Sequence, residues 1–178
     1  MLLWWTGAVV FVVLAASAVV FNDLVAARNQ VRAAWSDIDV QLTRRHDLVP
    51  QLVAAVQGYA SYERATLTTL TELRARAVSA ASLADKAQIE GELAQQIDRI
   101  FALQERYPDL KASENFLALQ RELVEIEDHL QHARRYYNGS VRDLNTKIER
   151  FPALIIARLA AFRAAEFFRS GTDQEAPA

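Results

Sequence analysis

The N-terminal end of the chain is apolar without interruption, unlike everything that follows it. Residues 2–21, LLWWTGAVVFVVLAASAVVF, contain no charged side chain. A helix needs about 20 apolar residues to cross a bilayer, and the rings of Trp4 and Trp5 suit a membrane interface. We therefore predict that residues 1–22 form a transmembrane anchor.

A cleaved signal peptide is the alternative interpretation of this segment. Ala16, Ser17 and Ala18 have the small-residue spacing that signal peptidase accepts. However, no Lys or Arg precedes the apolar run, and the run continues past that site to Phe21. These two features favour an uncleaved anchor.

Beyond the anchor, apolar residues recur every three or four positions, which is the spacing of amphipathic helices. A first long helix is predicted from Val31 to Tyr59. Pro50 lies inside it, but the apolar stripe keeps its phase on both sides, so we predict a kink rather than an end. The pattern then loosens into an Ala/Ser-rich patch, and a loop is expected near residues 78–83.

A second helix is predicted from about Leu83 to Arg106, with Ser82 as its cap. The sequence Tyr107-Pro108-Asp109 ends it, and Asp109 or Ser113 can cap the third helix. The third stripe is the most regular, running from Phe116 to Ile148. Phe151-Pro152 closes that helix and begins a fourth, which is predicted to end at Phe167 and Phe168 with Ser170-Gly171 as C-terminal cap.

The pair Asn138-Gly139 lies within the third stripe, although Asn-Gly usually signals a tight turn. Tyr137, Val141 and Leu144 keep the phase of the stripe across it, whereas a turn would reset that phase. We therefore predict that the helix runs through the pair, at a cost of about 1 kcal/mol for the glycine relative to alanine.

Together these elements predict an all-α fold. It consists of an N-terminal transmembrane helix followed by an antiparallel up-and-down four-helix bundle with a long first helix. Residues 23–170 are expected to form the bundle and residues 171–178 a disordered tail.

Composition removes several classes of function. The 178 residues contain 20 Lys and Arg against 22 Asp and Glu, so no basic excess points to nucleic acid. The absence of cysteine excludes disulfides, thiolate catalysis and Cys-type zinc sites. No phosphate-binding glycine loop, nucleophile elbow or HExxH motif is present, so we predict no cofactor and identify no small-molecule substrate.

Two groups of polar residues could form sites. His129 and His132 lie three residues apart near Glu125 and Asp128, which could present metal ligands. The pattern of carboxylate-bridged metal bundles is missing, so we favour an ordinary solvated helix face. The second group surrounds Arg45, which interrupts the apolar stripe of the first long helix and is expected to be partly buried and paired with Asp or Asn on another helix.

Three stretches together resemble the LemA family of bacterial membrane proteins: AWSDIDVQLTRRHDLVPQLVAAVQGYA, ERYPDLKASENFLALQRELVEIE, and ARRYYNGSVRDLN with FPALIIA. The resemblance implies a single membrane helix, an antiparallel helical bundle and no established enzymatic activity. The chain departs from the family pattern at Ser113, Leu144 and Ala161, where Asn, an aromatic residue and Gly are usual. The motif residues that the resemblance places in an interaction or structural role are Trp35, Asp37, Asp39, Arg44, Arg45, Asp47, Pro50, Tyr107, Pro108, Asp109, Asn138, Asn145 and Pro152.

The leading hypothesis is a non-enzymatic scaffold or adaptor, tethered to the bacterial inner membrane through residues 2–21, that binds other proteins or copies of itself. Arg28 and Arg32 follow the anchor, and this position of positive charge places the bundle in the cytoplasm. The alternatives are a metal-dependent enzyme and an envelope-side stress or structural protein.

Overall fold

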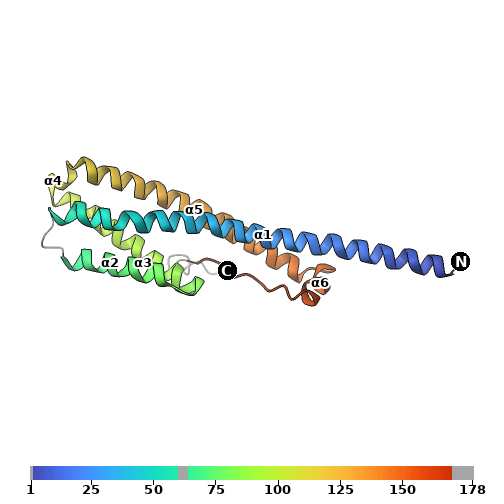
Figure 1. Ribbon diagram of the computed structural model, residues 1–178. Coiled ribbons are helices and arrows are strands. Elements are labelled where there is room, and N and C mark those ends of the chain that lie inside the picture. Colours follow the sequence, from blue (N-terminus) through green and yellow to red (C-terminus); the bar gives the residue numbers. More distant parts are fainter. Residues whose placement is uncertain (1, 60–63, 170–178) are drawn as a thin grey trace. The chain divides into compact units, whose positions relative to one another are not determined.

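The computed structural model describes residues 2–59 and 64–169, and its only regular elements in these ranges are helices, with no strand (Figure 1). The predicted all-α class is confirmed. The predicted tail and the Ser170-Gly171 cap lie outside the described residues. The α-helices are α1 (Leu2–Gln57), α2 (Arg64–Ser79), α3 (Leu83–Ala102), α4 (Pro108–Lys111), α5 (Glu114–Glu149) and α6 (Ala153–Leu159), and a 3-10 helix, η2, covers Leu103–Glu105.

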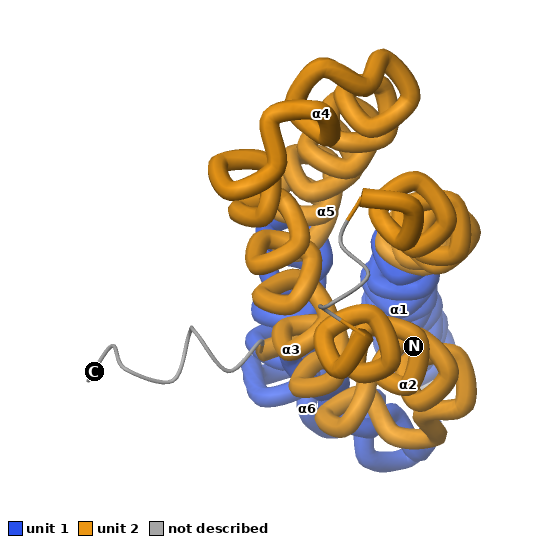
Figure 2. The backbone as a smooth tube through the Cα atoms, turned by 90° about the vertical axis from the view of Figure 1, so that its left-hand side faces the viewer, with its two compact units in different colours: residues 1–36, 135–167 blue, residues 37–134, 168–178 orange. Residues whose placement is uncertain are grey.

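The chain forms two compact units (Figure 2). The first contains the chain up to Ser36 together with Arg135–Phe167, and the second contains Asp37–Arg134 with the chain from Phe168 onward. Helices α1 and α5 therefore each contribute to both units. The predicted boundary at residue 22 is a different division and stays a prediction.

Helix α1 joins the apolar N-terminal segment and the first amphipathic stripe into one helix, with Pro50 inside it. The prediction that Pro50 does not end the helix is confirmed. Among the described helices α1 alone is long and apolar enough to cross a membrane, and only 6% of its most apolar stretch is buried. A core helix of a soluble protein would be mostly buried, so the apolar part of α1 does not have the burial of a core helix.

In the first unit, α1 and α5 run antiparallel. Lys147 Nζ lies 2.6 Å from Asp23 Oδ1, and Gln30 hydrogen-bonds the Tyr136 hydroxyl. The earlier residue of α1, Asp23, thus contacts the later residue of α5, Lys147, as expected for antiparallel helices. The ring of Trp35 meets that of Tyr137 edge to face at 5.7 Å, which adds an aromatic contact at the same interface.

The core of the second unit is built from the predicted stripes. Leu52 from α1, Leu70 from α2, Leu93 from α3 and Phe116 from α5 are fully buried in one cluster. Burial of such side chains stabilises a fold by about 1.5–3 kcal/mol each. The helix starts also follow the sequence: Ser82 Oγ accepts a hydrogen bond from Asp85 N at 3.0 Å, which is the predicted cap of α3.

Ser113, rather than Asp109, caps α5, because its Oγ accepts a hydrogen bond from Phe116 N at 3.4 Å. Asp109 instead lies in the first turn of the short α4. Further along, α5 passes through Asn138-Gly139 without a break, as the stripe predicts. A Cβ atom placed on Gly139 would meet nothing within 4 Å, so close approach of another helix does not explain the glycine.

Two sequence predictions of helix extent are wrong. The sequence stripes do not predict α2 as a helix of its own, yet Arg64–Ser79 is helical and packs on α3. The predicted fourth helix is too long, because α6 ends at Leu159 and residues 162–169 are not helical. Ala161 has a φ of 54°, a left-handed conformation that stops an L-residue helix.

Side-chain hydrogen bonds explain the conformation of this C-terminal segment. The Asn145 amide donates to Ala165 O at 3.0 Å, and Ala165 N donates to Asn145 Oδ1 at 2.8 Å. The Tyr137 hydroxyl donates to Glu166 O at 2.9 Å. These side chains satisfy backbone groups that a longer helix would have satisfied internally.

Candidate functional site

The second unit encloses a charged cluster contributed by α1, α3 and α5. The side chains of Arg45 and Glu90 are 2% and 0% exposed, and His46 is also buried. Lys, Arg, Asp and Glu are almost never fully buried unless they are paired. This cluster is therefore the part of the unit where polar chemistry is concentrated.

Each member of the cluster forms an ion pair or a hydrogen bond with another member. Arg45 Nη1 lies 3.5 Å from Glu90 Oε2, and Arg45 Nη2 pairs with the Glu127 carboxylate. The other oxygen of Glu90 lies 2.6 Å from His46 Nε2. The backbone oxygen of His46 accepts a hydrogen bond from Arg74 Nε at 3.2 Å, which ties α2 to the cluster.

Burial lowers the pKa of Arg45 to about 10, because the charged guanidinium loses its hydration, and the carboxylate of Glu90 opposes this effect. Arg134 lowers the pKa further as a neighbouring positive charge. A pKa of about 10 still leaves Arg45 charged at neutral pH. The cluster is thus a buried ion pair, in which removing one partner leaves an uncompensated charge.

The outer side of the cluster opens into a pocket of about 270 Å³. Arg45, Glu127, Asp98 and Asp128 line it, whereas His46 and Glu90 do not. Arg134 Nη1 lies 3.8 Å from Glu127 Oε1, so two arginines share that carboxylate. The histidine and carboxylate that resemble an acid–base pair are therefore not presented to the pocket.

The predicted burial and pairing of Arg45 are confirmed, but its partners are glutamates rather than Asp or Asn. Sequence reasoning missed Glu90, which lies at helical spacing between the buried residues Ala87 and Leu93. A charged residue on an apolar stripe is the same signal that identified Arg45, so this signal could have found Glu90. His46 and Glu127 have no comparable signal.

The other motif residues of α1 do not join the cluster. Asp37, Arg44, Asp47 and Pro50 are exposed. Asp39 Oδ1 lies 3.5 Å from Lys86 Nζ, at the surface.

Most of the later motif residues lie at or near helix starts, and Asn145 holds the C-terminal segment by hydrogen bonds. Tyr107 packs on the core, and Pro108 and Asp109 begin α4. Pro152 precedes α6, and Asn138 is half-buried on α5. Asn145 holds the C-terminal segment as described above, together with Tyr137, whose pKa is raised by burial and by the nearby Glu166 carboxylate.

The histidines His129 and His132 lie on the exposed face of α5. His129 Nε2 is 3.6 Å from Glu125 Oε1, one helical turn earlier. Within residues 2–59 and 64–169, no group of three or more His, Asp or Glu side chains is arranged to hold a metal ion.

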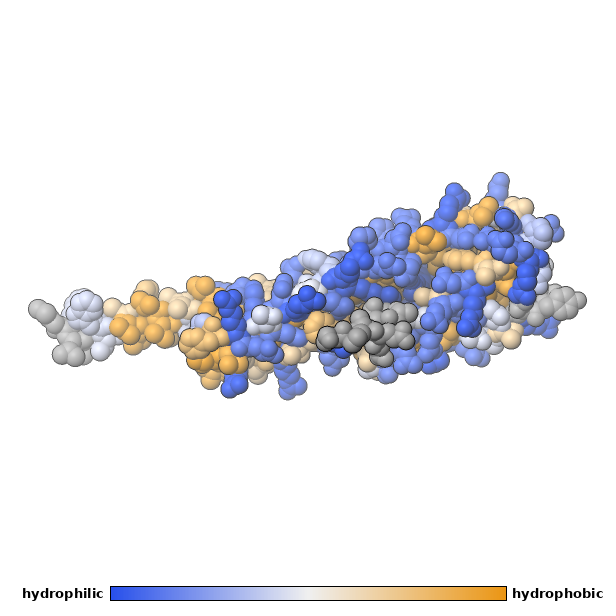
Figure 3. All heavy atoms as spheres, turned by 180° about the vertical axis from the view of Figure 1, so that it is seen from behind, coloured by the Kyte–Doolittle hydropathy of each residue, from blue (hydrophilic) through white to orange (hydrophobic). Residues whose placement is uncertain are grey.

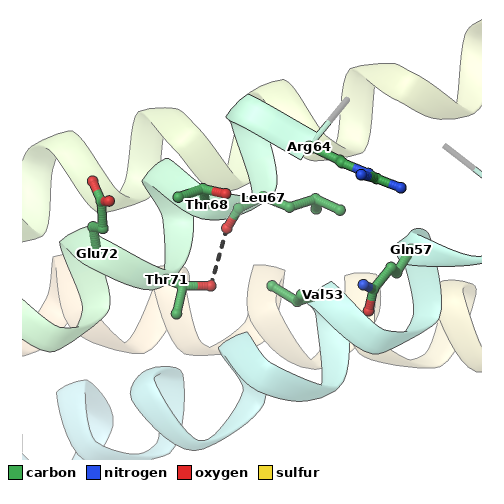
Figure 4. Close-up of a pocket in the computed structure, with 7 residues that line it drawn as sticks. All are labelled: Val53, Gln57, Arg64, Leu67, Thr68, Thr71 and Glu72. Carbon is green, nitrogen blue, oxygen red and sulfur yellow. Dashed lines mark hydrogen bonds between the residues drawn. The ribbon is translucent and has the colours of Figure 1, made fainter. Parts of the chain in front are cut away.

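Two further hollows occur on the second unit. One, of about 540 Å³, lies between the end of α1 and α2, and it is lined by the apolar Val53 and Leu67 and by polar side chains such as Arg64 and Glu72 (Figure 4). Thr71 Oγ1 donates to Leu67 O at 3.0 Å on its wall. The other, of about 600 Å³, follows α5 and is lined by Leu117, Gln120, Arg121, Val124, Glu125 and Asp128.

Comparison with known proteins gives two groups of relatives. Residues 34–178 match the sequence profile of the LemA family. Protein LemA of Metamycoplasma hominis is 31% identical over 162 residues, which cover 85% of this chain and 73% of that protein. Magnetosome protein MamQ 2 of Paramagnetospirillum magneticum is 24% identical over 89% of this chain and 66% of its own length. Magnetosome protein MamQ of Magnetospirillum gryphiswaldense is 22% identical over 88% of this chain and 67% of its own length. None of these names specifies a reaction.

Proposed function

Because this chain belongs to the LemA family, we propose that it is a membrane-anchored, non-enzymatic adaptor that binds a helix of another protein along α5. The family has no defined enzymatic activity, and the only buried acid–base pair found in the described residues, His46 with Glu90, does not line the neighbouring pocket. Binding is the activity that the remaining surface supports.

The groove along α5 carries this proposal. Leu117 and Val124 are exposed, and because they lie seven residues apart they occupy the same face of the helix. Arg121, Glu125 and Asp128 surround them with charge. An apolar surface with a polar rim is typical of an interaction site, and an amphipathic helix places its apolar side chains into such grooves at intervals of three, four and seven residues.

The test replaces one apolar residue of the groove by a charge. We expect Val124→Glu in the full-length, membrane-extracted protein to reduce recovery of a specific partner at least about tenfold, because a buried valine contributes roughly 1.5 kcal/mol or more to an interface. Val40→Glu is the matched control, since Val40 is an exposed valine on α1 that does not line the groove. Equal recovery with Val124→Glu and the unchanged protein would refute binding at this groove.

We also propose that the anchor lies in the bacterial inner membrane with the second unit in the cytoplasm. Arg28 and Arg32 support this orientation, since positive charges next to a membrane helix stay on the cytoplasmic side. The chain has no cysteine, so one cysteine at the exposed Val78 gives an unambiguous label. Labelling by an impermeant maleimide only after the cells are permeabilised supports the orientation, whereas labelling of intact spheroplasts would place the unit on the envelope side.

A further inference from the structure

Helix α6 and the residue pair before it expose large apolar side chains that the first unit does not cover. Phe151, Ile155 and Leu159 are 74%, 53% and 83% exposed. Ile155 and Leu159 lie four residues apart on one face of α6, while Ala157 is fully buried on the other side. Helix α6 thus has apolar side chains both on the side that packs against the first unit and on the side that faces outward. A surface helix in water instead has polar side chains on its outer side.

Contacts within the first unit place α6 beside the C-terminal end of the anchor segment, near Phe21 and Asp23. The ring of Phe162, just after α6, meets the ring of Phe21 edge to face at 6.0 Å. Lys147, near the end of α5, pairs with Asp23 at 2.6 Å. Phe21 ends the uncharged segment and Asp23 is the first charge after it, so α6 lies where α1 would leave the hydrocarbon core. Figure 3 shows hydrophobic surface along the N-terminal part of α1.

The charge of the first unit complements an anionic lipid surface. Residues 23–36 and 135–167 contain eight Lys and Arg against four Asp and Glu, although the whole chain carries a net charge of −2. Arg150, Arg158 and Arg163 are exposed around α6. Arg28 stacks over the Phe162 ring at 5.0 Å, which adds a cation at the same level.

We propose that α6 lies in the headgroup region of the membrane, with Phe151, Ile155 and Leu159 inserted toward the acyl chains and the surrounding arginines bound to anionic headgroups. This goes beyond the adaptor function but rests on the anchor that the proposed function includes. An element that lies on the membrane in this way combines buried apolar area with attraction to anionic lipids. The first unit is then held to the bilayer at a second point besides α1, in whichever leaflet the body faces.

The experiment measures the depth of single fluorescent labels in vesicles that contain the full-length protein. Because the chain has no native cysteine, an NBD label is attached separately to cysteines at Val12, Leu159 and Val78. The vesicles are phosphatidylcholine with or without phosphatidylglycerol, and the quencher is a spin label on the lipid acyl chain. We expect quenching at Val12 in the anchor and at Leu159 in α6, and none at Val78 on the second unit.

The outcomes separate this inference from the proposed function. The interfacial position of α6 is overturned if the lipid spin label quenches the label at Val12 but not the label at Leu159, and if iodide in the water quenches Leu159 as fully as Val78. This result leaves the anchor intact. Absence of quenching at Val12 overturns both. Arg158→Gln and Arg163→Gln test whether the arginines bind anionic headgroups. Each should lower the ratio of inserted to uninserted α6 about fivefold in anionic vesicles. Equal insertion of α6 with and without phosphatidylglycerol would contradict this role of the arginines.

Discussion

Replacing Arg45 by Met tests whether the buried cluster is held by the ion pair. Met fills a similar apolar volume and adapts to irregular surroundings, so packing changes little. The substitution instead removes the cation between Glu90 and Glu127. Glu90, which has no exposed surface, then keeps only His46 as its partner.

The expected loss is about 3–5 kcal/mol in the free energy of unfolding, which is typical when one member of a buried pair is removed. Most of it arises at Glu90. Glu127 is 33% exposed and remains 3.8 Å from Arg134, so water and the second arginine compensate its charge.

A second substitution separates charge from packing. In Arg45→Met with Glu90→Gln, the buried carboxylate becomes a neutral amide that can still hydrogen-bond His46. We expect the double variant to be more stable than Arg45→Met alone by about 2 kcal/mol, because the amide removes the unpaired buried charge that causes most of the loss in Arg45→Met.

The assay is urea unfolding of the full chain in a non-ionic detergent, followed by far-UV circular dichroism. Urea is chosen because guanidinium is a salt and screens charge. Arg44→Met is the control, because Arg44 is exposed next to Arg45, and its change should stay within about 0.5 kcal/mol. Equal stability of the Arg45 and Arg44 variants, or a double variant no better than Arg45→Met, would refute the reasoning.

The first unit supplies the remaining predictions. Gly139→Ala should raise the free energy of unfolding by about 1 kcal/mol in the same urea assay, because α5 gains helix propensity and the new methyl group meets no neighbour. Ala161→Gly should also stabilise, by about 1 kcal/mol, because glycine adopts a φ of 54° without strain; a loss of stability would contradict that conformation. Asn145→Ala should speed hydrogen exchange of residues 162–169 relative to α3, since two hydrogen bonds to that segment are lost. In a tyrosinate absorbance titration, the component that Tyr137→Phe removes should lie above the ordinary tyrosine range, because burial and the Glu166 carboxylate raise the pKa of Tyr137 in the folded chain. The unfolded chain then loses that proton first, so stability from this group is complete below pH 10, falls above it, and this alkaline loss should disappear in Tyr137→Phe.

Much of the fold could be predicted from the spacing of apolar residues. The continuity of α5 through Asn138-Gly139 followed from the phase of Tyr137 and Val141, because a long stripe outweighs a two-residue turn signal. The end of α6 could not be predicted this way. Phe162 and Phe168 continue an apolar pattern, but the chain there is bound by Asn145, a residue 20 positions earlier whose contact depends on the tertiary fold.

The candidate site was predictable only in part, for a similar reason. Arg45 and Glu90 interrupt apolar stripes, and such interruptions indicate buried charges that need partners. Which partner each one takes depends on how α1, α3 and α5 pack in the second unit. The expected Asp or Asn partner for Arg45 was therefore wrong, although its burial was correct.

The most direct test of the adaptor function is photocrosslinking in living cells that express the full-length chain. A benzophenone amino acid is placed at Val124 in the α5 groove or, as the control, at Val40 on α1. We predict a discrete crosslinked product from position 124, abolished by Leu117→Glu, and none from position 40. The same diffuse products from both positions, unchanged by Leu117→Glu, would contradict binding of a partner helix along α5.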